Sequence, residues 1–158
     1  MTYRITDNIN LPFKIMPLIK EYVNGVIEAR IKVKSIFDKN VHATNVVIKI
    51  PCPRDTSMVN SHSRTGRAKY EPDNGAVVWR IKKYHGDHET FLRSDMARLK
   101  GGEKKPWKMS PILMDFQVAM FTASGLRIRF LKVTEKNAYK PVKWIRYITK
   151  AGCYEHRL

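Results

Sequence analysis

Apolar and polar residues alternate with a period of two along most of this chain, as they do in β-strands that bury one face. Residues 26–37 show the pattern most clearly. Their apolar positions are Ile27, Ala29, Ile31 and Val33, and the charged positions between them are Glu28, Arg30, Lys32 and Lys34. This segment is therefore expected to form a strand with one buried face and one solvent face that carries all of these charges.

Further segments have the same strand character and are separated by turn signals. They are residues 45–51, 64–72, 76–84, 90–99 and 112–120. The tetrapeptide Pro-Asp-Asn-Gly at 72–75 favours a turn, so the strands on either side of it are predicted to form a hairpin. The predicted buried positions are Val77, Trp79 and Ile81 in the hairpin, and Ile112, Met114, Phe116 and Val118 in the last segment.

The chain is predicted to end in two more strands, residues 125–133 and 143–148. Residues 85–89 are expected to form a loop, and residues 100–111 a long exposed connection. No stretch has a helical period. Short strands at regular spacing, with turn signals between them, indicate an all-β protein with the architecture of an antiparallel β-sandwich.

The chain carries 30 Lys and Arg residues against 14 Asp and Glu residues, which gives a formal net charge of +16. The excess is spread along the chain and is strongest over residues 119–158. Such a surface attracts nucleic acid, anionic membrane or an acidic partner, and charge alone does not decide among them. Two cysteines, Cys52 and Cys153, are too few for a disulfide scaffold and indicate a reducing compartment. No apolar run approaches the roughly 20 residues that a membrane span needs.

The sequence contains no motif that indicates an enzyme, such as a nucleophile elbow, a P-loop or a zinc-protease helix. His85, Asp87 and His88 could bind a metal, but no second cluster has matching spacing, and a solvated loop is the favoured interpretation. Cys52 lies between two prolines and is expected to be unreactive. The chain is therefore predicted to be non-enzymatic and to use no cofactor or metal.

Cationic residues gather on the predicted hairpin. Arg64, Arg67 and Lys69 precede its turn, and Lys82 and Lys83 end its return strand. Arg67 and Lys69 share strand parity, so their charges point the same way and could together hold a multiply charged phosphate. The alternative, which this stretch leaves open, is a face whose charge only keeps the protein in solution.

Near the end of the chain, Trp144 and Arg146 share one face of a predicted strand. An exposed indole beside a guanidinium can hold a planar aromatic ring by stacking and cation–π attraction. Strand parity alone favours the alternative, in which Trp144 is a core residue and Arg146 a charge at its rim. Nucleic-acid bases could also stack on Trp144 and Tyr147, which leaves a basic nucleic-acid-binding β-domain open as a function.

Several segments carry a resemblance to a known family. They are YRITDNINLPFKIMPLIKE at 3–21, GRAKYEPDNGAVVWRIKK at 66–83, SGLRIRFLKV at 124–133 and VKWIRYITKAGCYEHR at 142–157. In this order, they resemble the carboxy-terminal signal-binding domain, or mu homology domain, of clathrin adaptor medium (mu) chains. The first and the last segment look most like the plasma-membrane adaptor.

The resemblance implies a β-sandwich domain of two subdomains, one inserted into the other. Residues 1–118 would form the inserted subdomain, and residues 119–158 the last strands of the other. The family's earlier strands, including the one whose Asp bonds the signal tyrosine, would lie outside this chain. Strands without those neighbours expose an edge, so 119–158 is expected either to pair with a second copy or to be poorly ordered.

The resemblance also implies recognition of Tyr-x-x-(bulky hydrophobic) signals in the cytosolic tails of membrane cargo, bound as an added strand. Trp144 and Arg146 would form the tyrosine pocket. The pocket for the hydrophobic residue would be formed by Ile128, Leu131, Lys143 and Ile145. Ile128 and Leu131 have opposite strand parity, so a bulge or an edge would have to turn both toward the signal.

Members of this family also bind phosphatidylinositol bisphosphate. Arg67 and Lys69 stand where two of the lysines are expected, and Thr65 stands at a third, with Arg64 beside it. The implied partners are cargo tails, the other adaptor subunits, the phosphoinositide membrane and, indirectly, the clathrin coat. The implied location is cytoplasmic, on the plasma membrane and in clathrin-coated pits and vesicles. A structural subunit that has lost signal binding is a further alternative.

Overall fold

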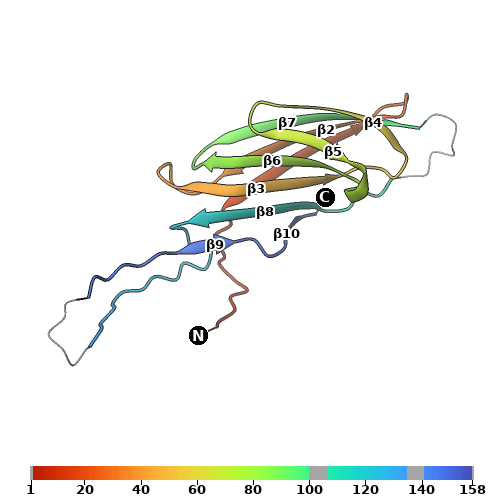
Figure 1. Ribbon diagram of the computed structural model, residues 1–158. Helices are drawn as coiled ribbons and strands as arrows, with labels where there is room; N and C mark the ends of the chain where they lie inside the picture. Colours follow the sequence, from red (N-terminus) through yellow and green to blue (C-terminus); the bar gives the residue numbers. More distant parts are fainter. Residues whose placement is uncertain (1, 100–106, 135–140, 158) are drawn as a thin grey trace.

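Two antiparallel β-sheets pack face to face in the computed structural model, which describes residues 2–99, 107–134 and 141–157 (Figure 1). The four-stranded sheet has the order β1 (Phe13–Glu21), β2 (Val26–Ser35), β7 (Glu89–Arg98) and β4 (Thr56–Ser63). The six-stranded sheet has the order β10 (Tyr154–His156), β8 (Ile112–Ala119), β3 (His42–Pro51), β6 (Ala76–His85) and β5 (Arg67–Glu71), with β9 (Ile148–Lys150) also paired to β8. A short 3-10 turn, η1 (Pro72–Asn74), links β5 to β6, and the described residues contain no α-helix. The predicted all-β, antiparallel sandwich is confirmed.

The inner faces of both sheets form the hydrophobic core at the positions that the alternation predicts. The buried residues include Ile27, Ala29, Ile31 and Val33 of β2, Val77, Trp79 and Ile81 of β6, and Ile112, Met114, Phe116 and Val118 of β8. An aromatic cluster closes one end of this core. The Phe13 ring meets the rings of Phe37 and Tyr84 edge-on, at centroid distances of 5.4 and 5.3 Å. The buried Tyr84 hydroxyl donates to Val33 O at 2.7 Å, so this polar group is hydrogen-bonded inside the core.

Glu28 departs from the alternation. The sequence places it on the solvent face of β2, yet its side chain is only 3% exposed. The Tyr22 hydroxyl donates to one carboxylate oxygen at 2.7 Å, and Arg30 Nε donates to the other at 2.6 Å. Arg93 on β7 forms an ion pair with the same carboxylate at 3.1 Å. These groups cover the carboxylate, and the Tyr22 and Arg30 hydrogen bonds lower its pKa.

Three strands, β1, β4 and β10, are not predicted from the sequence. β1 contains Pro17, which argues against a central strand, but β1 lies at a sheet edge, where one side of the strand has no partner. β4 is largely polar and therefore lacks the alternation that reveals a half-buried strand, and it is also an edge strand. β10 has only three residues.

The predicted terminal strands are wrong over most of their length. Residues 125–134 and 141–147 form no strand, and Ile148 is the only residue of 143–148 that lies in one, β9. A strand needs a neighbour for its backbone N–H and C=O groups, and the described part of the chain supplies none along these segments. The other predicted strands are present with small shifts at their ends. β5, for example, begins at Arg67 because residues 64–66 form a bend.

The connection predicted over 100–111 is only partly exposed. Trp107 and Met109 are half-buried and pack against the core, whereas Lys108 and Ser110 are exposed. Inward and outward positions also alternate in this stretch, but in the opposite phase to β8, whose buried residues are the even-numbered ones. Residues 100–106 of the same connection lie outside the described residues.

We predict that Glu28→Gln destabilises the protein at neutral pH and makes its stability less dependent on pH. The fold holds the pKa of Glu28 below its ordinary value of 4.5, so the stabilisation is present above that value and is lost as the pH falls through the folded pKa. Urea unfolding at neutral pH and at about pH 3 measures both effects. Asp73→Asn, which alters an exposed turn carboxylate, is the matched control. Equal pH dependence in the wild type and in Glu28→Gln would contradict the prediction.

Candidate functional site

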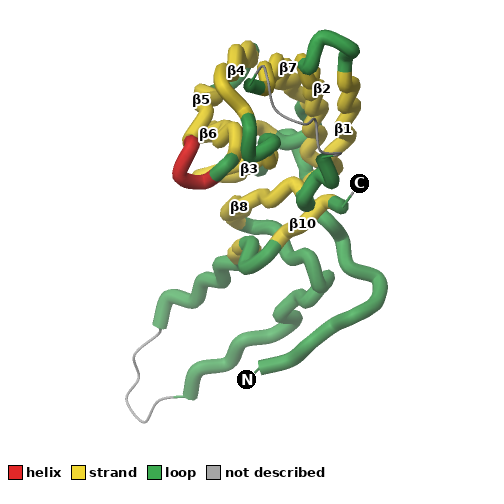
Figure 2. Tube along the Cα trace, turned by 90° about the vertical axis from the view of Figure 1, so that its right-hand side faces the viewer, coloured by secondary structure: helices red, strands yellow, loops and turns green. Residues whose placement is uncertain are grey.

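The chain segments after β8 and before β9 leave the sandwich together as a ribbon. We use this name for residues 124–134 and 141–147, whose two arms project beyond the sheets in both views (Figures 1 and 2). Tyr147 joins the arms. Its carbonyl accepts from Met120 N at 2.7 Å, and its hydroxyl accepts from Ile128 N at 2.8 Å. The Thr149 hydroxyl, which donates to Phe121 O at 2.6 Å, strengthens the base of the ribbon.

Apolar side chains on the ribbon are exposed rather than buried. They include Leu126, Ile128, Phe130, Leu131, Val133, Val142 and Trp144. The Trp144 side chain is 75% exposed, so the interpretation of Trp144 as a core residue does not hold in this structure. Trp144 and Arg146 form no hydrogen bond, ion pair or ring contact within the described ranges. Both groups are therefore accessible to a guest.

The ribbon also carries the other residues predicted to bind a signal. They are Ile128 and Leu131 on the first arm, and Lys143 and Ile145 on the second. Ile128 and Leu131 lie on irregular backbone, where strand parity does not apply. The described residues 129–134 and 142–146 make no backbone-to-backbone hydrogen bond. The ribbon thus combines unpaired backbone groups with exposed apolar side chains, which are the requirements for adding an extended peptide.

A second set of predicted residues, Arg64, Arg67 and Lys69, forms what we call the cationic patch. Arg67 and Lys69 are exposed on β5, the edge strand of the six-stranded sheet, and Arg64 is exposed in the bend before it. Strand register places Arg67 opposite Arg80 of β6. The three patch residues form no ion pair with any described residue. Their charges are therefore available to an anion.

A buried tryptophan and a glycine fix the bend that starts the patch. Trp79, which is fully buried, donates Nε1 to Thr65 O at 2.7 Å. Gly66 has a φ of +76°, and a Cβ at this position would lie 2.3 Å from Arg80 O. A larger residue therefore cannot occupy this position unless the backbone of β6 moves. Thr65, where the resemblance leads one to expect a lysine, is half-buried in the same bend.

Arg80 adds little free charge to the cationic patch, because Glu71 binds it. Arg80 Nη1 donates to Glu71 Oε1 at 2.7 Å, and Asn74 Nδ2 donates to Glu71 Oε2 at 2.7 Å. The Arg80 hydrogen bond lowers the pKa of Glu71, so the carboxylate stays ionised beside the guanidinium.

Sequence reasoning missed the positioning roles of Tyr147, Trp79 and Glu71. Their hydrogen-bond partners are 19, 14 and 9 residues away in the chain, and strand pairing determines which groups meet over such separations. Of these three contacts, only the one between Glu71 and Arg80 could have been predicted from the sequence. The predicted hairpin about 72–75 places Glu71 and Arg80 on one face of the sheet.

Ion pairs are distributed unevenly between the two sheets. On the four-stranded sheet, Glu28 pairs with Arg30 and Arg93, and Glu89 pairs with Lys32 and Lys34. On the six-stranded sheet, by contrast, Arg80 and Glu71 form the one ion pair that joins two described strand residues. Unpaired positive charge therefore lies mainly on the six-stranded sheet, where the cationic patch is located.

The residues that could have supported catalysis are not arranged for it. His85 is the exposed last residue of β6, and Asp87 and His88 are exposed in the link to β7. The described residues contain no group of three or more His, Cys, Asp or Glu side chains able to hold a metal ion. Burial raises the pKa of the Cys52 thiol to about 11, which keeps it protonated and unreactive. Across the described ranges, no helix is long and apolar enough to cross a membrane.

Comparison with known proteins adds sequence relatives and a fold neighbour. The Adaptor complexes medium subunit family matches residues 1–158. The chain is 44% identical over 160 residues to "AP-2 complex subunit mu" of Dictyostelium discoideum, and 38% identical over 163 residues to "AP-2 complex subunit mu" of Caenorhabditis elegans. These matches cover 100% and 99% of this chain but 36% and 37% of the relatives, so the chain spans little more than a third of their length.

The fold neighbour is the yeast delta-COP-I mu-homology domain. It superimposes with a TM-score of 0.50 at 14% sequence identity, over 69% of this chain and 41% of that domain. At this level of identity, the similarity bears on the fold alone, and it agrees with the antiparallel sandwich described above.

We predict that Gly66→Ala lowers the free energy of unfolding by about 2–4 kcal/mol, because the added Cβ meets the Arg80 carbonyl and also requires an unfavourable φ. Gly75→Ala is the matched control. Gly75 also has a positive φ, of +55°, but a Cβ there meets nothing within 4 Å, so a loss of about 1 kcal/mol is expected. Urea unfolding measures both values. Equal losses in the two variants would show that the close approach to β6 is unimportant.

Proposed function

Since the chain belongs to the adaptor complexes medium subunit family, we propose that it recognises tyrosine-based sorting signals in the cytosolic tails of membrane cargo during clathrin-mediated endocytosis. Family membership confirms the resemblance seen in the sequence. Subunits of this family are adaptors rather than enzymes, which agrees with the absence of a catalytic motif. The observation that carries the proposal is the accessible indole of Trp144 and the accessible guanidinium of Arg146 on one arm of the ribbon.

The proposed mode of binding is strand addition along the ribbon. The signal tyrosine stacks against Trp144 and Arg146, where cation–π attraction and ring contact each contribute about 0.5–2 kcal/mol. The bulky hydrophobic residue of the signal lies against the apolar surface of the ribbon, at Ile128, Leu131, the aliphatic stem of Lys143 and Ile145. Main-chain groups of the signal pair with the unpaired backbone of the arms.

The cationic patch supports a second part of the proposal, contact with phosphatidylinositol bisphosphate in the membrane. Arg64, Arg67 and Lys69 present positive charge from a sheet edge, and none of them forms an ion pair with a described carboxylate. The relatives named as subunits of the AP-2 complex support a cytoplasmic location on the plasma membrane, in coated pits and vesicles. The proposed partners are cargo tails, the other adaptor subunits and, through them, the clathrin coat.

We also propose that residues 1–118 and 119–158 belong to two subdomains, the first inserted into the second. The projection of the ribbon beyond the sheets supports this division, although β9 and β10 pair with β8 of the sandwich. The exposed apolar side chains of the ribbon also provide a surface for self-association with a second copy of the chain.

We predict that Trp144→Ala and Arg146→Ala each weaken binding of a signal peptide at least about tenfold, as expected for the loss of a central contact. The probe is a fluorescein-labelled decapeptide with one Tyr-x-x-Leu signal, and fluorescence anisotropy measures its dissociation constant. The control peptide has Ala in place of the tyrosine.

Phe130→Ala is the control variant, because Phe130 is also an exposed aromatic residue of the ribbon, 77% exposed, and has no proposed role in signal binding. Sedimentation at the same protein concentrations reports any self-association that competes with the peptide. Equal affinity for the tyrosine and alanine peptides, or an equal loss in all three variants, would refute signal recognition.

We predict that the chain binds vesicles containing phosphatidylinositol bisphosphate more tightly than phosphatidylserine vesicles of equal surface charge. The double variant Arg67→Glu, Lys69→Glu should weaken this binding at least about tenfold, since each basic residue near an anionic surface contributes about 1 kcal/mol. Flotation of the vesicles with bound protein measures the effect.

The double variant Lys14→Glu, Lys20→Glu is the matched control, because it makes the same change of charge on β1 of the other sheet. Equal binding to the two kinds of vesicle, with single-stranded RNA displacing both at moderate salt, would contradict the lipid proposal. That outcome would favour a nucleic-acid-binding domain.

A further inference from the structure

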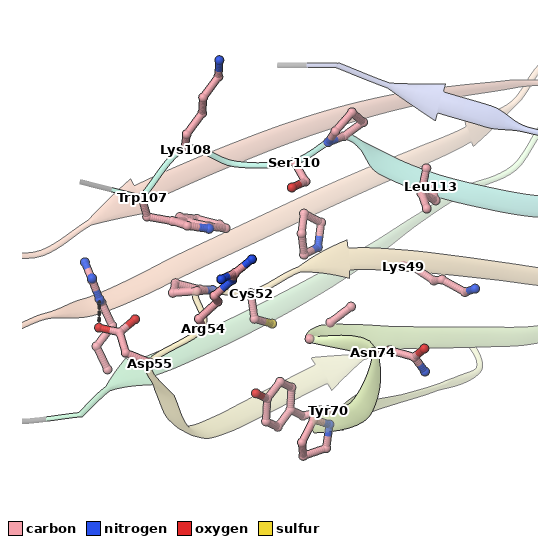
Figure 3. Close-up of a pocket in the computed structure, with 17 residues that line it drawn as sticks. Lys49, Cys52, Arg54, Asp55, Tyr70, Asn74, Trp107, Lys108, Ser110 and Leu113 are labelled. Carbon is pink, nitrogen blue, oxygen red and sulfur yellow. Dashed lines mark hydrogen bonds and ion pairs between the residues drawn. The ribbon is translucent and has the colours of Figure 1, made fainter. Parts of the chain in front are cut away.

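A cavity is lined by residues of the η1 turn, the end of β3 and the start of β8 (Figure 3). These elements meet at the end of the sandwich away from the ribbon (Figure 1). The volume of the cavity is about 900 Å³, and it forms where the end of β3, the η1 turn and residues 107–113 meet. Figure 3 shows the Trp107 ring over the interior of the cavity, and the Lys49 and Lys108 side chains directed away from it. No residue of the ribbon or of the cationic patch lines this cavity.

The floor of the cavity is apolar and rigid. Cys52 and Pro53 are buried beneath it, and the half-buried Trp107 and Tyr70 pack against the hydrophobic core. Further prolines that line it are Pro51, Pro72 and Pro111. Because prolines and packed rings have little conformational freedom to lose, an apolar group can bind here at low entropic cost.

The rim of the cavity carries positive charges that are not paired with any carboxylate of the described residues. Lys49, Arg54 and Lys108 line it and form no ion pair with any described residue. Asp55 is the acidic residue in its wall, and the Asp55 carboxylate already accepts a hydrogen bond from Arg98 Nε at 2.8 Å. The cavity therefore combines an apolar floor with polar walls and with cations at its rim that have no described ion-pair partner.

We propose that this cavity binds a short acidic peptide segment that carries one bulky apolar side chain. The apolar side chain lies on the floor against Trp107 and Tyr70. Carboxylates on either side of it in the peptide face Lys49, Arg54 and Lys108. The site is independent of the proposed signal site on the ribbon, so the two can be tested separately.

The placement of the cations favours a peptide over a phosphoinositide headgroup or an inorganic phosphate. Lys49 belongs to β3, Arg54 to the turn after β3, and Lys108 to the segment before β8, so the charges lie apart along the rim and do not converge on one point. A compact polyphosphate would satisfy the cations but leave the aromatic floor uncovered. A peptide instead distributes its charges along a chain and places an apolar side chain between them.

The test uses a fluorescein-labelled nonapeptide with a central Phe flanked by four Glu residues on each side. Fluorescence anisotropy gives its dissociation constant for the full chain. Two control peptides replace the Phe by Ser or every Glu by Gln, and each is expected to bind at least about tenfold more weakly. Inositol hexakisphosphate and a single-stranded oligonucleotide are added as competitors.

Two cavity variants are measured against matched controls. Trp107→Ala removes the ring on the floor, and Arg54→Glu with Lys108→Glu reverses two exposed rim charges without altering the core. Both variants are expected to weaken binding of the nonapeptide at least about tenfold. Lys14→Glu with Lys20→Glu makes the same change of charge elsewhere and is expected to weaken it about twofold or less. Thermal unfolding followed by circular dichroism confirms that each variant is folded.

Selective loss of nonapeptide binding in the cavity variants would establish the site. Because both rim residues are exposed, the charge-reversal variant decides the question even if Trp107→Ala fails to fold. An equal loss in the β1 control, or no binding of the nonapeptide, would overturn the proposal. Tighter binding of inositol hexakisphosphate or of the oligonucleotide to the same rim residues would also overturn it, because the cavity would then be a phosphate site. Each of these results leaves signal binding at Trp144 unaffected.

Discussion

Every strand in this protein depends on a neighbouring strand to hydrogen-bond its backbone, and that requirement divides the chain into two kinds of structure. β3 has β6 on one side and β8 on the other, and its inward residues are fully buried. The ribbon has a strand-like sequence but no such neighbours among the described residues, so its backbone is irregular and its apolar side chains are exposed. The same alternation thus gives a core in one place and an exposed apolar surface in the other.

This division explains how much could be predicted from the sequence. Alternation identified β2, β6 and β8 because each of these strands buries one face against the core. It missed β1 and β4, whose edge positions tolerate a proline and a polar sequence. Trp144 and Arg146 could be selected from their spacing and from the family resemblance. The exposure of Trp144 could not, because burial depends on which other segments cover a side chain.

An aromatic residue helps to position each of the three proposed functional surfaces. Trp79 holds the bend of the cationic patch from within the core, and Tyr147 links the two arms of the ribbon. Trp107 packs against the core and forms part of the cavity floor. Such residues connect packing to recognition, because a change in the core alters the position of charges or apolar groups at the surface. Rigid positioning of this kind also reduces the entropy lost when a partner binds.

The chain contains three tryptophans, and each lies in a different environment. Trp79 is fully buried, Trp107 is half-buried at the cavity, and Trp144 is 75% exposed on the ribbon. A water-soluble quencher of fluorescence therefore reaches the Trp144 indole readily and the Trp107 indole less readily, and it reaches the Trp79 indole only when the sandwich opens. The intrinsic fluorescence of one unlabelled sample consequently contains separate optical signals from the ribbon, the cavity and the core.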